Sequence, residues 1–315
     1  MNFNITKIES NKSSGTFNAV MSAIMWGADT VLIGLVIVLV SSLNMKNAVF
    51  LAPFVSAFLH DFCSAIWLTI YLFIKRELKK VKISLKTKSA KFVILGGVLG
   101  GPIGMAGYLL AIQNLGASYT AAISSIYPAV GAIMAKIILK EKMNKRGWIG
   151  LILSILGITI MSYSKSETSV NIIGFLFLIL CIVGWGSEAV VCAIGMNDDE
   201  ISSNIALFLR QCTSSIIYGI VIIPLIKGVE ITFNTITDNV MFLIVLTAFF
   251  GAVSYTCYYS AISKIGATKA MGINITYFVW AMIFDTIFMG NDLLIKNIFF
   301  GIIIMFGSYL VAKED

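Results

Sequence analysis

The sequence predicts an all-α integral membrane protein with ten transmembrane helices, arranged as two inverted repeats of five helices each. Composition, the length of the apolar runs and an internal repeat lead to this fold class. Of the 315 residues, 58% are hydrophobic and only 12% are charged, and the mean hydropathy is +0.92. A soluble domain carries about 25% charged residues. This chain has too little charge to cover a water-facing surface, so its solvent must be lipid.

Apolar runs recur along the whole chain, and each is long enough to cross a hydrocarbon core of about 30 Å. Lipid cannot satisfy a free backbone N–H or C=O group, so these runs must be helical. The expected helices cover roughly residues 16–40, 49–74, 92–112, 118–139, 147–163, 171–194, 204–226, 240–262, 268–289 and 297–312. We expect one membrane domain, made of a polar N-terminal segment (1–15), a first repeat (16–163) and a second repeat (171–312).

The distribution of lysine and arginine indicates the orientation of these helices. With the N-terminus in the cytoplasm, 17 of them fall in inside segments and four in outside segments. Such an excess is typical of cytoplasmic loops, so we expect a multi-pass cell-membrane protein with both termini inside. The net charge of +7 has the same origin, because the positive residues lie between apolar runs. It does not indicate a nucleic-acid partner.

Residues that would mark an enzyme or a metal protein are missing from the sequence. The five cysteines all lie inside apolar runs and form no CxxC pair, so neither disulfides nor a metal site are expected. There is no nucleotide-binding loop and no nucleophilic triad. We therefore expect no cofactor and no enzymatic activity.

An internal repeat runs through both halves of the chain. At an offset of 150 residues, Tyr108 falls on Tyr258 and Tyr127 on Tyr277. At an offset of 159, the stretch Trp26-Gly27-Ala28-Asp29 falls on Trp185-Gly186-Ser187-Glu188. Five helices per repeat is an odd number, so the two copies must cross the membrane in opposite directions. This inverted-repeat architecture is typical of secondary transporters.

Aromatic residues occur within the apolar runs, several of them at repeat-related positions. Inverted repeats place a substrate near the midplane between the halves. The aromatic candidates for that site are Trp26, Tyr127, Trp185, Tyr277 and Trp280, with Tyr255, Tyr258 and Tyr259. Aromatic faces attract a quaternary ammonium group, which needs no hydrogen bonds. The alternative is that these rings face lipid or the membrane interface.

Acidic residues within helices are costly in lipid and must face protein, ligand or water. Glu188 lies one helical turn from Trp185, an arrangement suited to an organic cation beside an aromatic wall. Asp29 is placed similarly after Trp26. The alternative for Glu188 is a protonated or salt-bridged carboxyl group that holds helices together.

His60 and Asp61 align with Arg210 and Gln211 in the second repeat. A histidine titrates near neutral pH, so His60 either carries a coupling proton or forms hydrogen bonds in a polar helix junction. Arg210 either pairs with an acidic group, Asp61 or the 198–200 cluster, or extends to the cytoplasmic interface.

Glycines crowd one helix together with Pro102. They favour close helix packing, with a hinge at Gly101-Pro102 as the alternative. The residues that form this stripe are Gly96, Gly97, Gly100, Gly101 and Gly104.

Together these features resemble the drug/metabolite transporter (DMT, EamA-like) superfamily, and more closely its LicB-type choline permeases. The motifs that carry the resemblance are His60-Asp61-Phe62, Gly101-Pro102-Ile103-Gly104-Met105, Ser124-Ser125-Ile126-Tyr127-Pro128-Ala129, Trp185-Gly186-Ser187-Glu188, Leu209-Arg210-Gln211, Tyr258-Tyr259 and Tyr277-Phe278-Val279-Trp280. The resemblance implies import of choline, which some bacteria attach as phosphocholine to surface polymers. It also implies an aromatic box formed by Trp26, Tyr127, Trp185, Tyr277 and Trp280.

The sequence thus predicts a choline-type permease that works by alternating access, with the lipid bilayer as its environment and no obligate protein partner. Three alternatives remain open. The first is an exporter of amino acids, drugs or other metabolites with the same fold. The second is a membrane-embedded enzyme acting on lipid-linked intermediates, and the third is a non-transporting receptor or scaffold.

Overall fold

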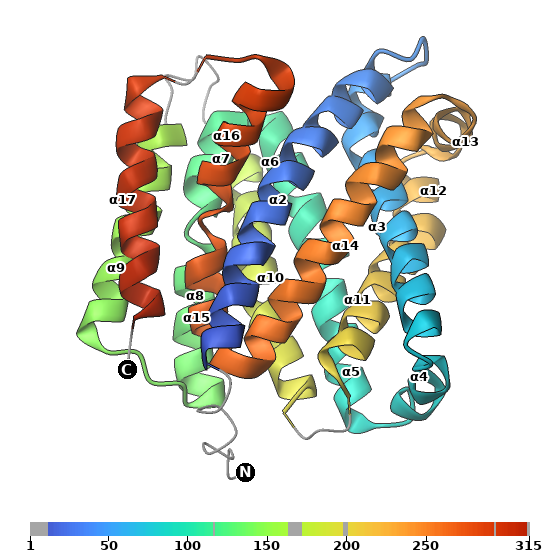
Figure 1. The fold of residues 1–315 in the computed structure, drawn as a ribbon. Coiled ribbons are helices and arrows are strands. Elements are labelled where there is room, and N and C mark those ends of the chain that lie inside the picture. The colour runs from blue at the N-terminus through green and yellow to red at the C-terminus, as the bar shows by residue number, and fades with distance from the viewer. Residues whose placement is uncertain (1–11, 116, 163–171, 198–200, 293, 314–315) are drawn as a thin grey trace.

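The computed structural model describes residues 12–115, 117–162, 172–197, 201–292 and 294–313, and all regular elements in this part of the chain are helices (Figure 1). The predicted all-α class is confirmed. The elements, of which η1 to η3 are π-helical, are α2 (Lys12–Ser41), α3 (Ala48–Ile74), α4 (Leu78–Ser84), α5 (Lys88–Val98), η1 (Leu99–Met105), α6 (Ala106–Leu115), α7 (Ala117–Ser124), α8 (Tyr127–Met134), η2 (Ala135–Leu139), α9 (Lys145–Ser162), α10 (Ile172–Gly195), α11 (Ser203–Ile217), η3 (Tyr218–Ile222), α12 (Ile223–Leu225), α13 (Val229–Thr237), α14 (Val240–Ile265), α15 (Ala267–Asn274), α16 (Tyr277–Met289) and α17 (Ile295–Ala312).

Within the described residues, eight helical segments are long and apolar enough to cross a membrane. Two of the ten expected helices are not among them. The helix expected at 118–139 is divided into α7, α8 and η2, and its apolar part, Tyr127–Leu139, is shorter than the ~20 residues that span a bilayer. The helix expected at 147–163 corresponds to α9. The count of ten therefore stays a prediction.

The interruption after α7 recurs in the second half of the chain. α7 and α15 begin at Ala117 and Ala267, and α8 and α16 begin at Tyr127 and Tyr277. Both pairs of starting points are 150 residues apart, as in the repeat of the sequence. Pro128 accounts for the first interruption, because proline fits the first turn of a helix and not its interior. The opposite orientation of the two halves remains a prediction.

Helix α10 lies at the centre of the bundle, packed against α5, η1, α6 and α8. Helix α2 crosses α14 and α16, and α3 packs on α11 and α14 (Figure 1). Helices α9 and α17 pair with each other at one side of the bundle (Figure 1). Lys12 at the start of α2 and Ala312 at the end of α17 lie at the same end of the molecule (Figure 1).

The distribution of polar and apolar side chains is the reverse of that in a soluble protein. Large apolar side chains such as Val49, Phe242 and Ile295 are exposed on the outside, whereas Asp29 and Arg210 are buried. Charged groups are tolerated inside membrane proteins only where they meet partners within the bundle. The fold therefore brings its chemistry to the centre, where α2, α3, α10, α11 and α14 meet.

Candidate functional site

Helix α10 presents its functional side chains on one face toward the stretch α5–η1. Trp185, Glu188 and Cys192 lie three, four and seven residues apart, which places them on one side of the helix. The Trp185 indole Nε1–H donates to the carbonyl of Gly100, at 3.1 Å. Gly100 lies in η1, and a π-helix changes the regular hydrogen-bond ladder of an α-helix.

Glycines in α5 and η1 create the room for these side chains. A β-carbon at Gly100 would collide with the carboxylate of Glu188, and one at Gly104 would lie 2.6 Å from Trp185 Cδ1. A β-carbon at Gly101 would collide with Ser214. The predicted close packing of the glycine stripe is therefore confirmed. The side chains that pack against these glycines include Glu188 and Trp185 of the site.

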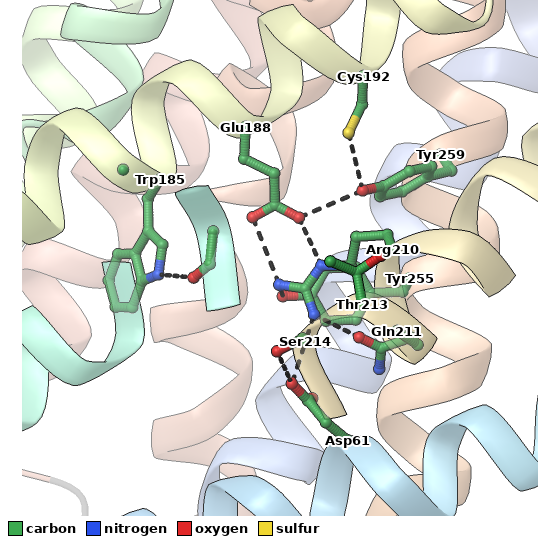
Figure 2. Close-up of polar contacts among 12 residues, drawn as sticks. Asp61, Trp185, Glu188, Cys192, Arg210, Gln211, Thr213, Ser214, Tyr255 and Tyr259 are labelled. Atoms are coloured by element: carbon green, nitrogen blue, oxygen red, sulfur yellow. Dashed lines mark hydrogen bonds and ion pairs between the residues drawn. The ribbon is translucent and has the colours of Figure 1, made fainter. Parts of the chain in front are cut away.

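The Arg210 side chain, only 3% exposed, lies at the centre of the polar network (Figure 2). Its Nε donates to Glu188 Oε1 at 2.7 Å and a terminal nitrogen lies 3.5 Å from Glu188 Oε2, which makes a two-pronged ion pair. The guanidinium also donates to Gln211 Oε1 and, at 3.3 Å, to the Tyr255 hydroxyl. Its carbon lies 4.8 Å from the centroid of the Tyr255 ring. Asp61 Oδ2 is 3.7 Å from its other terminal nitrogen.

The network continues from Asp61 into the first half of the chain. Asp61 Oδ2 accepts a hydrogen bond of 2.5 Å from Ser214, and Asp61 Oδ1 lies 3.5 Å from His60 Nδ1. His60 Nε2 lies 3.0 Å from Asp29 Oδ1. The imidazole ring thus lies between two carboxylates from different helices, α2 and α3.

The two halves contribute matching acid–base pairs. Asp29 pairs with His60 between α2 and α3, and Glu188 pairs with Arg210 between α10 and α11. Asp29 aligns with Glu188, and His60 with Arg210, in the repeat of the sequence. One pair contains a titratable base and the other a permanently charged one.

A small, partly open cavity lies beside Glu188, and its other walls are mostly aromatic. It is lined by Trp26, Tyr127, Trp185, Glu188, Ala189, Tyr255 and Tyr258. The ring of Trp26 lies 5.4 Å from that of Tyr255, and the ring of Tyr127 lies 5.7 Å from that of Trp185. We call this set of lining residues the cage. Its free volume of about 20 Å³ holds one water molecule, so an organic ligand requires the walls to move.

The candidate residues fall into three groups in the structure. Trp26, Tyr127, Trp185, Glu188 and Tyr258 line the cage. His60, Asp61, Asp29, Arg210 and Gln211 form the polar network next to it. Tyr277 does not line the cavity but stacks on Trp26, with ring centroids 5.0 Å apart.

Trp280, like Tyr277 and Tyr259, is not among the residues that line the cavity. Its Cβ packs where a side chain at Gly27 would lie, and its Nε1 is buried without a partner in the described structure. Tyr255 lines the cavity and was absent from the implied aromatic box. Its spacing of three residues from Tyr258 was the signal, because that spacing places both rings on one face of α14.

Arg210 does not extend to the interface as one alternative had it, because its side chain is buried against Glu188. Asp61 is one of the acidic partners expected for it, whereas the 198–200 cluster lies outside the described residues. Glu188 forms the ion pair between helices that one interpretation expected. It also lines the cavity, and its role toward a bound cation stays a prediction.

A second, open groove of about 480 Å³ runs between α2, α9 and α16. Thr30 and Gly34 line it and follow Trp26 by four and eight residues, so the groove lies on the face of α2 that carries Trp26. Asp285 also lines it and accepts a hydrogen bond of 2.9 Å from Asn291. The stacked rings of Trp26 and Tyr277 lie at the cage end of this face.

The packing of η1 on Glu188 yields a stability prediction. Gly100→Ala should destabilise the protein by about 1–3 kcal/mol, the usual cost of forcing a methyl group into a filled interior. The matched control is Gly301→Ala, where an added β-carbon would meet its nearest neighbours at an ordinary 3.6 Å. Thermal unfolding of the purified variants in detergent measures both. Equal melting temperatures would show that η1 can move away from Glu188 without cost.

Comparison with known proteins identifies the family to which this chain belongs. The sequence profile of the EamA-like transporter family matches residues 13–163 and again residues 172–313. Protein LicB of Haemophilus influenzae is 37% identical over 273 residues, which cover 85% of this chain and 87% of LicB. An uncharacterized transporter of Clostridium kluyveri is 24% identical over 245 residues, covering 75% and 76% of the two chains.

A solved crystal structure has the same fold, with a TM-score of 0.67 at 13% identity, over 95% of this chain and 96% of the other. The similarity to LicB agrees with the resemblance noted in the sequence motifs. This chain therefore belongs to the EamA-like transporter family, as a multi-pass membrane protein similar to LicB.

Proposed function

We propose that this protein is a permease that imports choline or a similar quaternary ammonium cation by alternating access. The observation that carries the proposal is the cage, in which five aromatic side chains and one carboxylate surround a single cavity. A quaternary ammonium ion has no N–H group to donate. Aromatic faces and a nearby negative charge are therefore the groups that recognise it.

The charge of the polar network also favours a cation. Three carboxylates, from Asp29, Asp61 and Glu188, face one guanidinium and one imidazole. With His60 neutral this network carries an excess of two negative charges, and with His60 protonated an excess of one. An excess of negative charge is costly in a low-dielectric interior, and a monovalent cation in the cage reduces it.

A zwitterionic substrate, such as the amino acids of an exporter, fits this charge pattern less well. Its carboxylate would need a free positive group at the cavity. Arg210, the permanent cation of the network, is already bound to Glu188. An anionic substrate meets the same obstacle, and a neutral substrate leaves the negative excess of the network uncompensated.

The proposed direction is inward across a bacterial cytoplasmic membrane, with both termini in the cytoplasm. The excess of basic residues in the segments assigned to the inside supports this orientation. A monovalent cation gains about 2.3 kcal/mol per 100 mV on moving to a negative interior. In this proposal the ten helices form two inverted halves that rock around the cage, and imported choline supplies phosphocholine for surface polymers.

We include a proton in the proposed cycle, carried at His60. The imidazole contacts Asp29 and Asp61, so its protonation changes the charge balance of the network that contains Arg210 and Glu188. Histidine is the side chain whose ordinary titration range includes physiological pH.

Uptake of radiolabelled choline into proteoliposomes under an inside-negative potential tests the function. Saturable uptake is expected from the native protein, and Trp185→Ala should raise KM by about tenfold or more, since a desolvated cation–π contact contributes about 2 kcal/mol. Trp148→Ala is the matched control, because Trp148 packs among Ala132, Leu151 and Val311, away from the cage. No uptake by a folded, reconstituted native protein would remove the choline assignment.

A further inference from the structure

Arg210 occupies the groups that a cation in the cage would use. Glu188 and Tyr255 both line the cavity. The guanidinium is bonded to both oxygens of Glu188 and lies over the ring of Tyr255. An organic cation that enters the cage therefore meets a carboxylate that is already neutralised and an aromatic face that already holds a positive charge.

A second set of partners lies on the other side of the guanidinium. Gln211 Oε1 already accepts from one terminal nitrogen, and Asp61 Oδ2 lies 3.7 Å from the same nitrogen (Figure 2). This separation is slightly longer than a hydrogen bond. A shift of under about 1 Å would convert it into a charge-assisted hydrogen bond at the usual distance of 2.7–2.9 Å. The hydrogen bond that Ser214 donates to Asp61 holds this carboxylate in position to accept from Arg210.

We propose that Arg210 is a tethered cation that occupies Glu188 and Tyr255 while the cage is empty, and that a quaternary ammonium ion displaces it toward Asp61 in order to bind. Two positive charges next to one carboxylate repel each other strongly at low dielectric, and Asp61 offers the guanidinium an equivalent partner nearby. Arg210 is then a specificity-determining residue. The inference rests on the proposed function and deepens it.

The displacement explains how the cage would exclude neutral molecules of the same shape. Only a cation offers Glu188 a replacement for the ion pair that it loses. A neutral ligand would leave Arg210 on Glu188 and would gain only the apolar contacts of the rings. The shift would also carry the binding event to Asp61 and so to His60, which contacts the other oxygen of Asp61.

Calorimetric binding to the purified protein in detergent tests the inference, with choline and its uncharged carbon isostere 3,3-dimethylbutan-1-ol as probes. Arg210→Gln should bind choline about tenfold more tightly, the gain expected if Arg210 holds Glu188 for about 90% of the time in the empty protein. The affinity for the isostere should change by less than about threefold, because the isostere does not compete for Glu188. Equal gains for both probes would mean that Arg210 only fills space, and the inference would be wrong.

A double-mutant cycle separates direct competition from the general field of the arginine. In Glu188→Gln the shared carboxylate is gone, so adding Arg210→Gln should change choline affinity by less than about threefold. A tenfold gain in that background as well would overturn the inference, since it would show an effect that does not pass through Glu188.

A further variant covers the case in which Arg210→Gln does not fold. Asp61→Asn removes the alternative partner of Arg210, so it should weaken choline binding about tenfold and leave the isostere unchanged. Unchanged or tighter choline binding in a folded Asp61→Asn protein would contradict the displacement. If the folded native protein binds no choline at all, the proposed function itself fails, whereas native binding with no response to these variants removes the displacement alone.

Discussion

Glu188→Ala is expected to abolish saturable choline uptake and to lower the free energy of unfolding by about 3–5 kcal/mol, the usual cost of removing one partner of a buried ion pair. The reason is that Glu188 has two roles. It is the carboxylate in the wall of the cage, and it accepts hydrogen bonds from Arg210 and, at 3.2 Å, from Tyr259. Its loss leaves the guanidinium short of a counter-charge in a side chain that is almost fully buried.

The control for this variant makes the same chemical change at an exposed position. Glu230 lies in the first turn of α13, where a carboxylate contributes about 0.3–1 kcal/mol through the helix dipole. Glu230→Ala should therefore leave uptake unchanged and stability nearly so. Glu188→Gln distinguishes the two roles, because the amide still accepts from Arg210 and Asp61 still balances the charge. It should fold and bind choline weakly. Native uptake by Glu188→Ala would contradict the assignment of Glu188 to the site.

The fold class and the family could be predicted from the sequence because they depend on properties that the sequence carries directly. Composition and the length of apolar runs require membrane helices, and the motifs around Trp185 and Tyr277 resemble those of a known family. The interruptions before Tyr127 and Tyr277 are harder to predict. They occur within continuous apolar runs, and only Pro128 marks one of them.

The arrangement of the site was only partly accessible from the sequence. The repeat aligned Asp29 with Glu188 and His60 with Arg210, but alignment within one chain does not show which residues meet across helices. The structure pairs each acid with the base of its own half, and then joins the halves through Asp61. Trp280 shows that helical spacing alone can mislead. It lies one turn from Tyr277, which suggested a place in the cavity wall, but it packs against the backbone of α2 at Gly27.

His60→Gln is expected to retain choline binding and to lose accumulation driven by a pH gradient. The glutamine amide can donate a hydrogen bond to Asp29 in place of His60 Nε2, so the junction between α2 and α3 is preserved. An amide does not titrate, so it cannot take up a proton outside and release it inside. A gradient of one pH unit stores about 1.4 kcal/mol per proton, which can support about tenfold accumulation of a coupled substrate.

The measurement is choline uptake into proteoliposomes with the membrane potential clamped at zero and the outside more acidic. The native protein should accumulate choline above equilibrium, whereas His60→Gln should only equilibrate it, with exchange of external for internal choline preserved. Exchange needs binding and the movement of the loaded carrier but no net proton transfer, so its survival would show that the variant fails at the proton step alone. His60→Ala should lose about 1–3 kcal/mol of stability as well, because it leaves buried Asp29 without its hydrogen-bond donor. Accumulation by His60→Gln equal to that of the native protein would show that a group other than His60 carries the proton, and His60 would then be a structural residue of the helix junction. A lack of accumulation by the native protein itself would assign the driving force to the membrane potential.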